Sequence, residues 1–129
     1  MNELDGELET SNRDLSPLRL KKRPQFLNVA AKGRKIPMPG LVLQVLHRCD
    51  EDVGRVGFTV TKKVGNSVIR NRVRRRLKAV FHETAKMISF KGYDLVLIGR
   101  EKTYHRAFKD ILNDFNRALN KAGIIKSDK

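Results

Sequence analysis

A chain of 129 residues with 40% hydrophobic and 33% charged side chains has the composition of one globular domain and is too apolar to be disordered throughout. Its 28 Lys and Arg residues outnumber 14 Asp and Glu residues, and the net charge of +14 indicates a polyanionic partner, with nucleic acid as the leading class. The single cysteine, Cys49, excludes an intramolecular disulfide, and no apolar run is long enough to cross a membrane.

The acidic residues are concentrated at the start of the chain. Residues 1–17 hold five acidic residues and one basic residue, so residues 18–129 hold 27 basic against 9 acidic residues, a net charge of +18. We predict a disordered acidic extension over residues 1–17, one folded domain over residues 18–122 and a flexible tail over residues 123–129. The acidic start lacks a signal-peptide pattern, which together with the lone cysteine predicts a cytoplasmic location.

The first predicted element is a helix that begins near Pro24. Proline suits the first helical turn, and Phe26, Val29 and Ala30 then share one face. Gly33 is expected to end this helix in a left-handed cap. A short edge strand is expected near residues 34–36, before two prolines interrupt the hydrogen-bonded ladder.

Two strands are expected next, over residues 41–46 and 55–61. The first is a continuous apolar run, whereas Val56, Phe58 and Val60 alternate with smaller or polar residues at the strand period. The acidic stretch with Gly54 between the two strands is typical of a turn. The pattern therefore predicts that they pair as a hairpin.

A long helix is predicted from Asn66 or Ser67 to about Lys86, and its apolar stripe consists of Ile69, Val73, Leu77, Val80 and Thr84. The apolar run over residues 93–99 is typical of a central strand covered on both faces. Thr103 is expected to cap a last helix that ends at Gly123, with a core stripe of Phe108, Ile111, Leu112, Phe115 and Leu119. These elements predict an α+β fold.

The segment KKVGNSVIRNRVRRRLK, residues 62–78, contains eight basic residues and no acidic one. Like charges four residues apart destabilise a helix by about a few tenths of a kcal/mol per pair, and a solvated surface helix usually alternates the two signs. RNA phosphates would supply the missing negative charge, and the helix start adds free N–H groups and the positive end of the helix dipole. Candidate RNA-binding residues are Lys62, Lys63, Asn66, Arg70, Asn71, Arg72, Arg74, Arg75 and Lys78.

A basic run can also arise without any RNA partner. It is often a solvated helix face, and clusters of Lys and Arg also serve as nuclear localisation signals. Here the basic residues keep a fixed register with the apolar stripe of the same helix, which favours phosphate binding. Arginine forks suit phosphate oxygens, while Asn71 offers a donor and an acceptor to a base edge or a 2′-hydroxyl.

Nothing in the sequence indicates that the protein itself is a catalyst. His47, His82 and His105 fall in three separate predicted elements, without the spacing of a metal or general-base site. The acidic run over residues 50–52 lies beside a glycine, so a solvated turn is a better interpretation than a metal site. We therefore predict no catalytic residue and no metal site.

The stretch RVGFTVTKKVGNSVIRNRVRRRLK, residues 55–78, resembles the signature of bacterial ribonuclease P proteins, including the Arg-Asn-Arg segment over residues 70–72. The resemblance extends to FLNVAAKGRK, LVLQVL and GYDLVLIGR and covers roughly residues 20–119. It implies a two-layer αβββαβα sandwich of the kind also found in a small-subunit ribosomal protein. It also implies a left-handed βαβ crossover, against the right-handed rule for such units.

The resemblance further implies an accessory subunit of an endoribonuclease, which binds the catalytic RNA of ribonuclease P and the 5′ leader of precursor tRNA while the RNA carries the chemistry. Mg²⁺ would be required by the RNA subunit, with no cofactor bound by the protein alone and no obligate protein partner. A groove between the first helix and the sheet would hold the leader, through Phe26, Gln44, Thr59 and Thr61. Ala30 and Gln44 stand where relatives often have an aromatic residue, and plain core packing is the alternative role for Phe26.

Two further function classes fit part of this pattern. A structural ribosomal RNA-binding protein would share the charge, the size and an α+β fold but would not need a leader groove. A metal-dependent nuclease acting alone would need convergent carboxylates, which the sequence does not offer.

Overall fold

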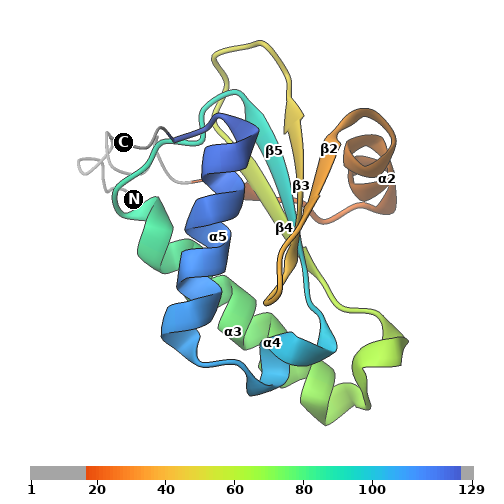
Figure 1. The fold of residues 1–129 in the computed structure, drawn as a ribbon. Coiled ribbons are helices and arrows are strands. Elements are labelled where there is room, and N and C mark those ends of the chain that lie inside the picture. Colours follow the sequence, from red (N-terminus) through yellow and green to blue (C-terminus); the bar gives the residue numbers. More distant parts are fainter. Residues whose placement is uncertain (1–16, 126–129) are drawn as a thin grey trace, which may run out of the picture.

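The computed structural model describes residues 17–125, in which a five-stranded mixed sheet carries helices on both faces (Figure 1). The strands are β1 (Leu18–Arg19), β2 (Arg34–Pro37), β3 (Val42–His47), β4 (Arg55–Thr59) and β5 (Tyr93–Ile98). The helices are α2 (Arg23–Lys32), α3 (Ser67–Ala85), α4 (Glu101–His105) and α5 (Phe108–Ala122), with a 3₁₀ turn, η1, at Lys62–Val64. The predicted α+β class and order of the main elements are confirmed, and β1 and α4 are two short additions.

The order of strands in the sheet is β1-β4-β5-β3-β2. Strand β5 lies in the centre, antiparallel to β3 and parallel to β4, so α3 connects two parallel neighbours. The predicted hairpin between residues 41–46 and 55–61 is wrong, because β5 lies between β3 and β4. Strand β5 is apolar along almost its whole length, and such a strand is most stable inside the sheet, where both of its faces are covered. The hairpin that does form joins β2 to β3.

Two hydrophobic clusters cover the two faces of the sheet. The larger lies under α3 and α5 and includes Leu95 and Leu97 of β5 together with Phe115 of α5. The smaller joins Val96 of β5 to Leu20 and Val29 under α2. Since neighbouring residues of β5 point to opposite clusters, the apolar character of the whole strand is explained.

Gly33 ends α2, but not in the predicted left-handed cap. Its φ of −91° and ψ of −179° are extended. A Cβ at this position would lie 2.4 Å from the carbonyl oxygen of Val45 in β3. The glycine is therefore needed because α2 approaches the sheet closely here. Its extended backbone conformation is one that any residue can adopt.

Thr103 does not cap the last long helix. It lies inside the short helix α4, where its hydroxyl accepts a hydrogen bond from the Arg100 N–H at 2.8 Å and donates one to the Gly40 carbonyl at 2.6 Å. The backbone at Arg106 is extended, so α5 begins separately at Phe108. Phe108 is 40% exposed, which moves the start of the core stripe to Ile111.

The last helix ends at Gly123, as predicted. The structure adds that Gly123 is left-handed, with φ of 83°. Beyond it, Ile124 and Ile125 are partly buried against the larger cluster, although the predicted tail begins at residue 123. The predicted acidic extension, apart from residue 17, and residues 126–129 of the predicted tail lie outside the described residues.

A network of ion pairs fixes the loop between β3 and β4. Asp94 of β5 is almost completely buried and accepts hydrogen bonds from Arg48 and Arg55, the latter at 2.8 and 2.6 Å. Arg48 also binds the carboxylate of Asp50 and the carbonyl oxygen of Val53. The acidic run over residues 50–52 is thus a turn, as predicted, and hydrogen bonds from Arg48 hold its conformation.

We expect Asp50 to give stability a measurable pH dependence. The hydrogen bond from Arg48 holds the pKa of Asp50 below its ordinary value of 3.8. Because the folded pKa is the lower one, this stabilisation is complete above the unfolded pKa and is lost as pH falls through the folded pKa. Asp50→Asn should therefore unfold at a lower temperature than the parent protein near pH 6, and the difference should shrink by about pH 2.

Thermal unfolding of both proteins across this pH range measures the effect. Glu51→Gln is the control, since its exposed carboxylate makes only a 3.9 Å contact with Lys91. A difference between Asp50→Asn and the parent that stays constant with pH would contradict the assignment.

Candidate nucleic-acid interface

Helix α3 begins where the sequence predicts. The Asn66 side chain accepts a hydrogen bond from the Ile69 N–H at 3.0 Å, so Asn66 is the N-cap. This bond satisfies one of the free N–H groups of the first turn and leaves the others at the exposed start of the helix.

The apolar stripe of α3 faces the sheet. Val73, Leu77 and Val80 are completely buried, and Thr84 is 6% exposed. Phe81, which the predicted stripe omits, is also buried and stacks on Phe90 with ring centroids 5.2 Å apart. This packing fixes which side of the helix is turned outward.

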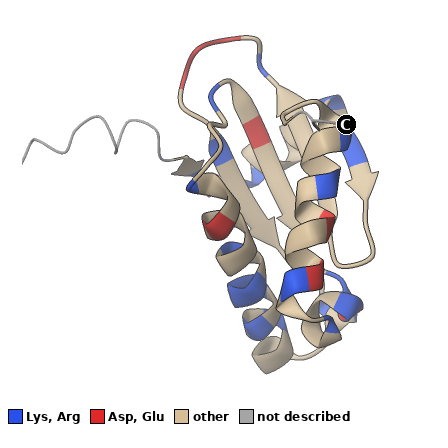
Figure 2. Ribbon diagram, turned by 60° about the vertical axis from the view of Figure 1, so that its left-hand side comes forward, with Lys and Arg blue, Asp and Glu red and all other residues tan. Residues whose placement is uncertain are grey.

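The predicted RNA-binding residues lie together on that outward side and on the turn before it. We call this set the basic face, and Figure 2 shows Lys and Arg repeated along α3. Asn71, Arg72 and Arg75 are exposed, and Arg70, Arg74 and Lys78 are half-buried. The remaining members, Lys62, Lys63 and Asn66, are exposed at η1 and the helix start.

The basic face has no carboxylate partners in the described part of the chain. Every ion pair found within residues 17–125 involves another cation, namely Arg48, Arg55, Lys86, Lys91 or Arg106. Arg70 instead donates to the Gly65 carbonyl at 3.1 Å, and Arg74 donates to the Asn71 side-chain oxygen at 2.9 Å. These two guanidinium groups are held by neutral acceptors, and no carboxylate within residues 17–125 neutralises their charge.

Arg76 belongs to the same basic run but has a different role. It is half-buried, donates to the Arg106 carbonyl, and its Nε is buried with no hydrogen-bond partner among residues 17–125. It ties α3 to the connection between α4 and α5. Sequence spacing alone does not separate this internal arginine from its exposed neighbours.

A groove of about 410 Å³ lies between α2 and the sheet. Three of the four predicted groove residues, Phe26, Gln44 and Thr59, line it together. Thr61 is exposed beyond the end of β4 and is not among the lining residues. The rest of the lining consists of Lys21, Arg23, Leu27, Ala30, Phe58 and Val96.

Phe26 reaches the groove because β4 has a glycine beneath its ring. A Cβ on Gly57 would lie 2.5 Å from Cε1 of Phe26. The ring is only partly buried, so it both packs on the smaller cluster and forms part of the groove wall. Lys21 and Arg23 add positive charge to the groove. In the sequence they belong to a basic stretch, residues 21–23, that leads into the first helix, a signal that the prediction does not use.

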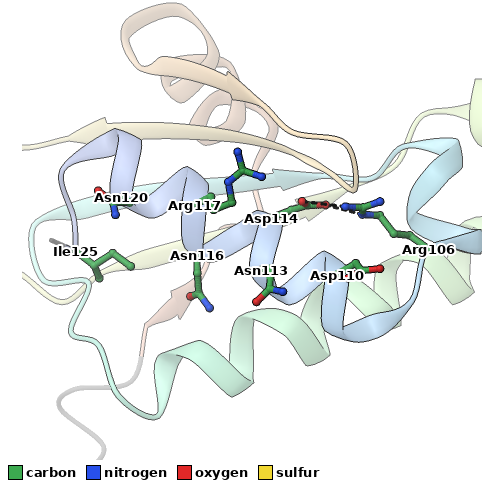
Figure 3. Close-up of a pocket in the computed structure, with 8 residues that line it drawn as sticks. All are labelled: Arg106, Asp110, Asn113, Asp114, Asn116, Arg117, Asn120 and Ile125. Carbon is green, nitrogen blue, oxygen red and sulfur yellow. Dashed lines mark hydrogen bonds and ion pairs between the residues drawn. The ribbon is translucent and has the colours of Figure 1, made fainter. Parts of the chain in front are cut away.

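A second hollow, of about 590 Å³, lies on the outer side of α5 and combines charges of both signs with asparagines (Figure 3). Asp114, buried at its base, accepts hydrogen bonds from the Gly40 N–H at 2.9 Å and from Arg106 Nε at 2.7 Å. The hydrogen bond to Asp114 raises the pKa of Arg106, which keeps this arginine charged and paired. The hollow is lined by two arginines and two aspartates, so its charge is balanced, unlike that of the basic face.

The described residues contain no constellation typical of an enzyme centre. No group of three His, Cys, Asp or Glu side chains within residues 17–125 is arranged to hold a metal ion. His47 stacks on Tyr93, His82 contacts the Lys78 carbonyl and His105 packs against Tyr104, so the three histidines stay apart. Among the described helices, none combines the length and apolar character needed to cross a bilayer.

Comparison with known proteins points to one family. Residues 16–123 match the family described as Ribonuclease P. The chain is 56% identical over 106 residues to the ribonuclease P protein component of Gluconacetobacter diazotrophicus, with 82% of this chain and 91% of the relative covered. It is 46% identical over 112 residues to that of Paramagnetospirillum magneticum, with 84% of each chain covered.

Solved structures agree with this comparison. The ribonuclease P protein of Staphylococcus aureus superposes with a TM-score of 0.71 at 25% identity, covering 86% of this chain and 100% of that chain. The ribonuclease P protein of Thermotoga maritima gives a TM-score of 0.68 at 25% identity, with coverage of 84% and 98%. The predicted resemblance is confirmed at the level of both sequence and fold.

Proposed function

Because the chain belongs to the bacterial ribonuclease P protein component family, we propose that it binds ribonuclease P RNA through the basic face and the 5′ leader of precursor tRNA in the groove beside α2. In this role it assists endonucleolytic removal of the leader, which yields the mature 5′ end of the tRNA. The RNA subunit and its Mg²⁺ ions carry out the cleavage, and the protein contributes binding.

The observation that carries the proposal is the uncompensated charge of α3. The cationic side chains of the basic face lie on this helix or just before it, and none meets a carboxylate within residues 17–125. Phosphate oxygens match the donor fork of arginine. Neutralised phosphates release their counterions, so binding should weaken steeply as salt concentration rises.

The groove supports the second half of the proposal. One wall carries the partly buried ring of Phe26, and Lys21 and Arg23 supply positive charge beside it. Aromatic rings stack on any base, and cations follow the backbone, which is the usual chemistry of single-strand binding. A leader held there distinguishes precursor from mature tRNA because only the precursor has a leader.

Reconstitution tests the function. Purified protein is added to the cognate ribonuclease P RNA, with no other protein, and cleavage of precursor tRNA is measured at low magnesium concentration. We expect faster cleavage and tighter precursor binding than with RNA alone. An unchanged rate would overturn the proposed role, while cleavage by the protein without RNA would establish a nuclease instead.

Replacing Phe26 by leucine should reduce the preference for precursor over mature tRNA. Stacking on one base is worth about 1–3 kcal/mol, so precursor affinity should fall by roughly fivefold to 150-fold while affinity for mature tRNA stays the same. The measurement is equilibrium binding of both tRNAs to the reconstituted complex. Phe108→Leu is the matched control, because Phe108 is also a partly exposed phenylalanine but lies at the start of α5. Equal losses for both tRNAs would assign Phe26 to packing alone.

A further inference from the structure

Helix α4 lies against α3, beside the part of the basic face that carries Arg72. The contact is close because the chain turns from β5 into α4 at Gly99, where a Cβ would lie 2.4 Å from Cγ1 of Val73 in α3. Arg76 adds a hydrogen bond from α3 to the end of α4. The relative position of the two helices is therefore fixed by packing.

Tyr104 of α4 is the residue that meets the basic face. Its ring is half-buried against the larger hydrophobic cluster, and the edge-on ring of His105 lies 4.9 Å away. The guanidinium carbon of Arg72 lies over the Tyr104 ring, 5.6 Å from its centroid. Arg72 is the only cation of the basic face within residues 17–125 that rests on an aromatic ring.

We propose that Tyr104 positions the Arg72 guanidinium and that the two together form a stacking site for an unpaired base of the bound RNA. This inference rests on the proposed function and extends the RNA-binding surface from α3 onto α4. The ring lies on one side of the guanidinium, 5.6 Å from its carbon atom. Because Arg72 is exposed, the opposite face is accessible to a base, and the N–H groups at the edge remain available to a phosphate.

The chemistry favours a base over an acidic side chain of a protein. A guanidinium that meets a carboxylate uses its edge, whereas a base stacks on the plane of the guanidinium, which the Tyr104 ring helps to position. Fixing the plane in advance also lowers the side-chain entropy lost on binding. The remaining cations of the basic face lack such support within residues 17–125, which distinguishes Arg72 from residues that only meet phosphates.

A double-mutant cycle tests the proposal with the full-length protein and the cognate ribonuclease P RNA. The variants are Tyr104→Leu, Arg72→Lys and the two combined, with Tyr104→Phe to retain the ring. Tyr93→Leu is the matched control, because Tyr93 is the other tyrosine of the chain, is likewise half-buried beside a histidine, and lies at the opposite end of β5. Affinity is measured at several salt concentrations, and chemical probing of the RNA bases reports protection.

We expect Tyr104→Leu and Arg72→Lys each to weaken binding by about fivefold to thirtyfold, with the double variant no weaker than either one. Tyr104→Phe should bind within about twofold of the parent protein, and the salt dependence should not change, since no phosphate contact is lost. The same unpaired base should lose protection in both single variants.

Additive losses in the cycle, or a Tyr104→Leu variant that binds like the parent protein, would overturn the proposal. The same holds if Tyr93→Leu weakens binding equally, because the loss would then come from general destabilisation. Failure of the proposed function has a separate signature, namely that the parent protein itself does not bind the RNA.

Discussion

Replacing Arg70 and Arg74 together by alanine should weaken binding to ribonuclease P RNA by roughly tenfold to a hundredfold near physiological salt. Each lost phosphate contact also removes nearly one unit from the slope of log affinity against log salt, so the slope should fall by about two units. The stability of the protein should barely change, because within residues 17–125 these two guanidinium groups bond only to the Gly65 carbonyl and the Asn71 side chain. Binding titrations at four or more salt concentrations measure both quantities.

The control for this variant removes the same charge elsewhere. Lys109→Ala with Lys121→Ala takes two exposed lysines from α5 and leaves the basic face intact. If net charge alone attracted the RNA, both double variants would lose the same affinity and slope. We expect the α5 variant to keep most of both, and an equal loss would remove the specific role of α3.

Asp94→Asn should strongly destabilise the protein, although it changes the shape of the side chain very little. The Asp94 side chain is 2% exposed and pairs with Arg48 and Arg55. The neutral amide therefore leaves Arg55 without a carboxylate partner within residues 17–125 and leaves Arg48 with Asp50 alone. Breaking a buried pair in this way costs about 3–5 kcal/mol. A domain of this size is stable by only about 5–15 kcal/mol, so the loss is a large fraction of the total.

Urea unfolding of the parent and variant proteins measures this loss. Asp52→Asn is the control, since Asp52 is exposed in the same loop and its side chain makes no ion pair within residues 17–125. A free energy of unfolding for Asp94→Asn within about 1 kcal/mol of the parent value would contradict the structural role of the network.

The elements that carry the candidate site are those that the sequence predicts best. In α3, the Asn66 cap and the apolar stripe at helical spacing are local signals that agree with each other, so the side of the helix that bears the arginines is determined before any tertiary contact is known. In β5, uninterrupted apolar character predicts a strand covered on both faces, and Val96 and Leu97 do face opposite clusters.

Features that depend on contacts between distant segments cannot be predicted from local patterns. Nothing in residues 41–61 signals that β5 separates β3 from β4, and the acidic turn between them satisfies the usual rule for a hairpin. Gly33 must be a glycine because a side chain there would meet the carbonyl of Val45, and Gly57 because a side chain there would meet the ring of Phe26. Only the assembled sheet brings these groups together. The expected hand of the βαβ crossover likewise depends on the family resemblance, since the general rule favours the opposite hand.

The division of the arginines shows the same limit within one helix. Arg72 and Arg76 are one turn apart and equivalent by spacing, yet Arg72 is exposed over Tyr104 while Arg76 is tied to the carbonyl of Arg106. The difference depends on where α4 lies against α3, and the sequence pattern does not separate α4 from the last helix. A site prediction from helical periodicity alone therefore gives the correct side of α3 but not the role of each residue.

Cleavage of ribonuclease P RNA from an iron chelate tethered to α3 tests most directly whether the outward side of this helix lies on the RNA. The single cysteine is exposed and can be replaced as Cys49→Ser, after which Ala79→Cys adds an attachment point on α3 without removing any charge. Asn120→Cys on α5 serves for comparison. We predict strong, localised hydroxyl-radical cuts in the RNA from position 79 and few from position 120. Cuts from position 120 alone, or none from position 79 in a complex that still forms, would contradict the assignment of the basic face.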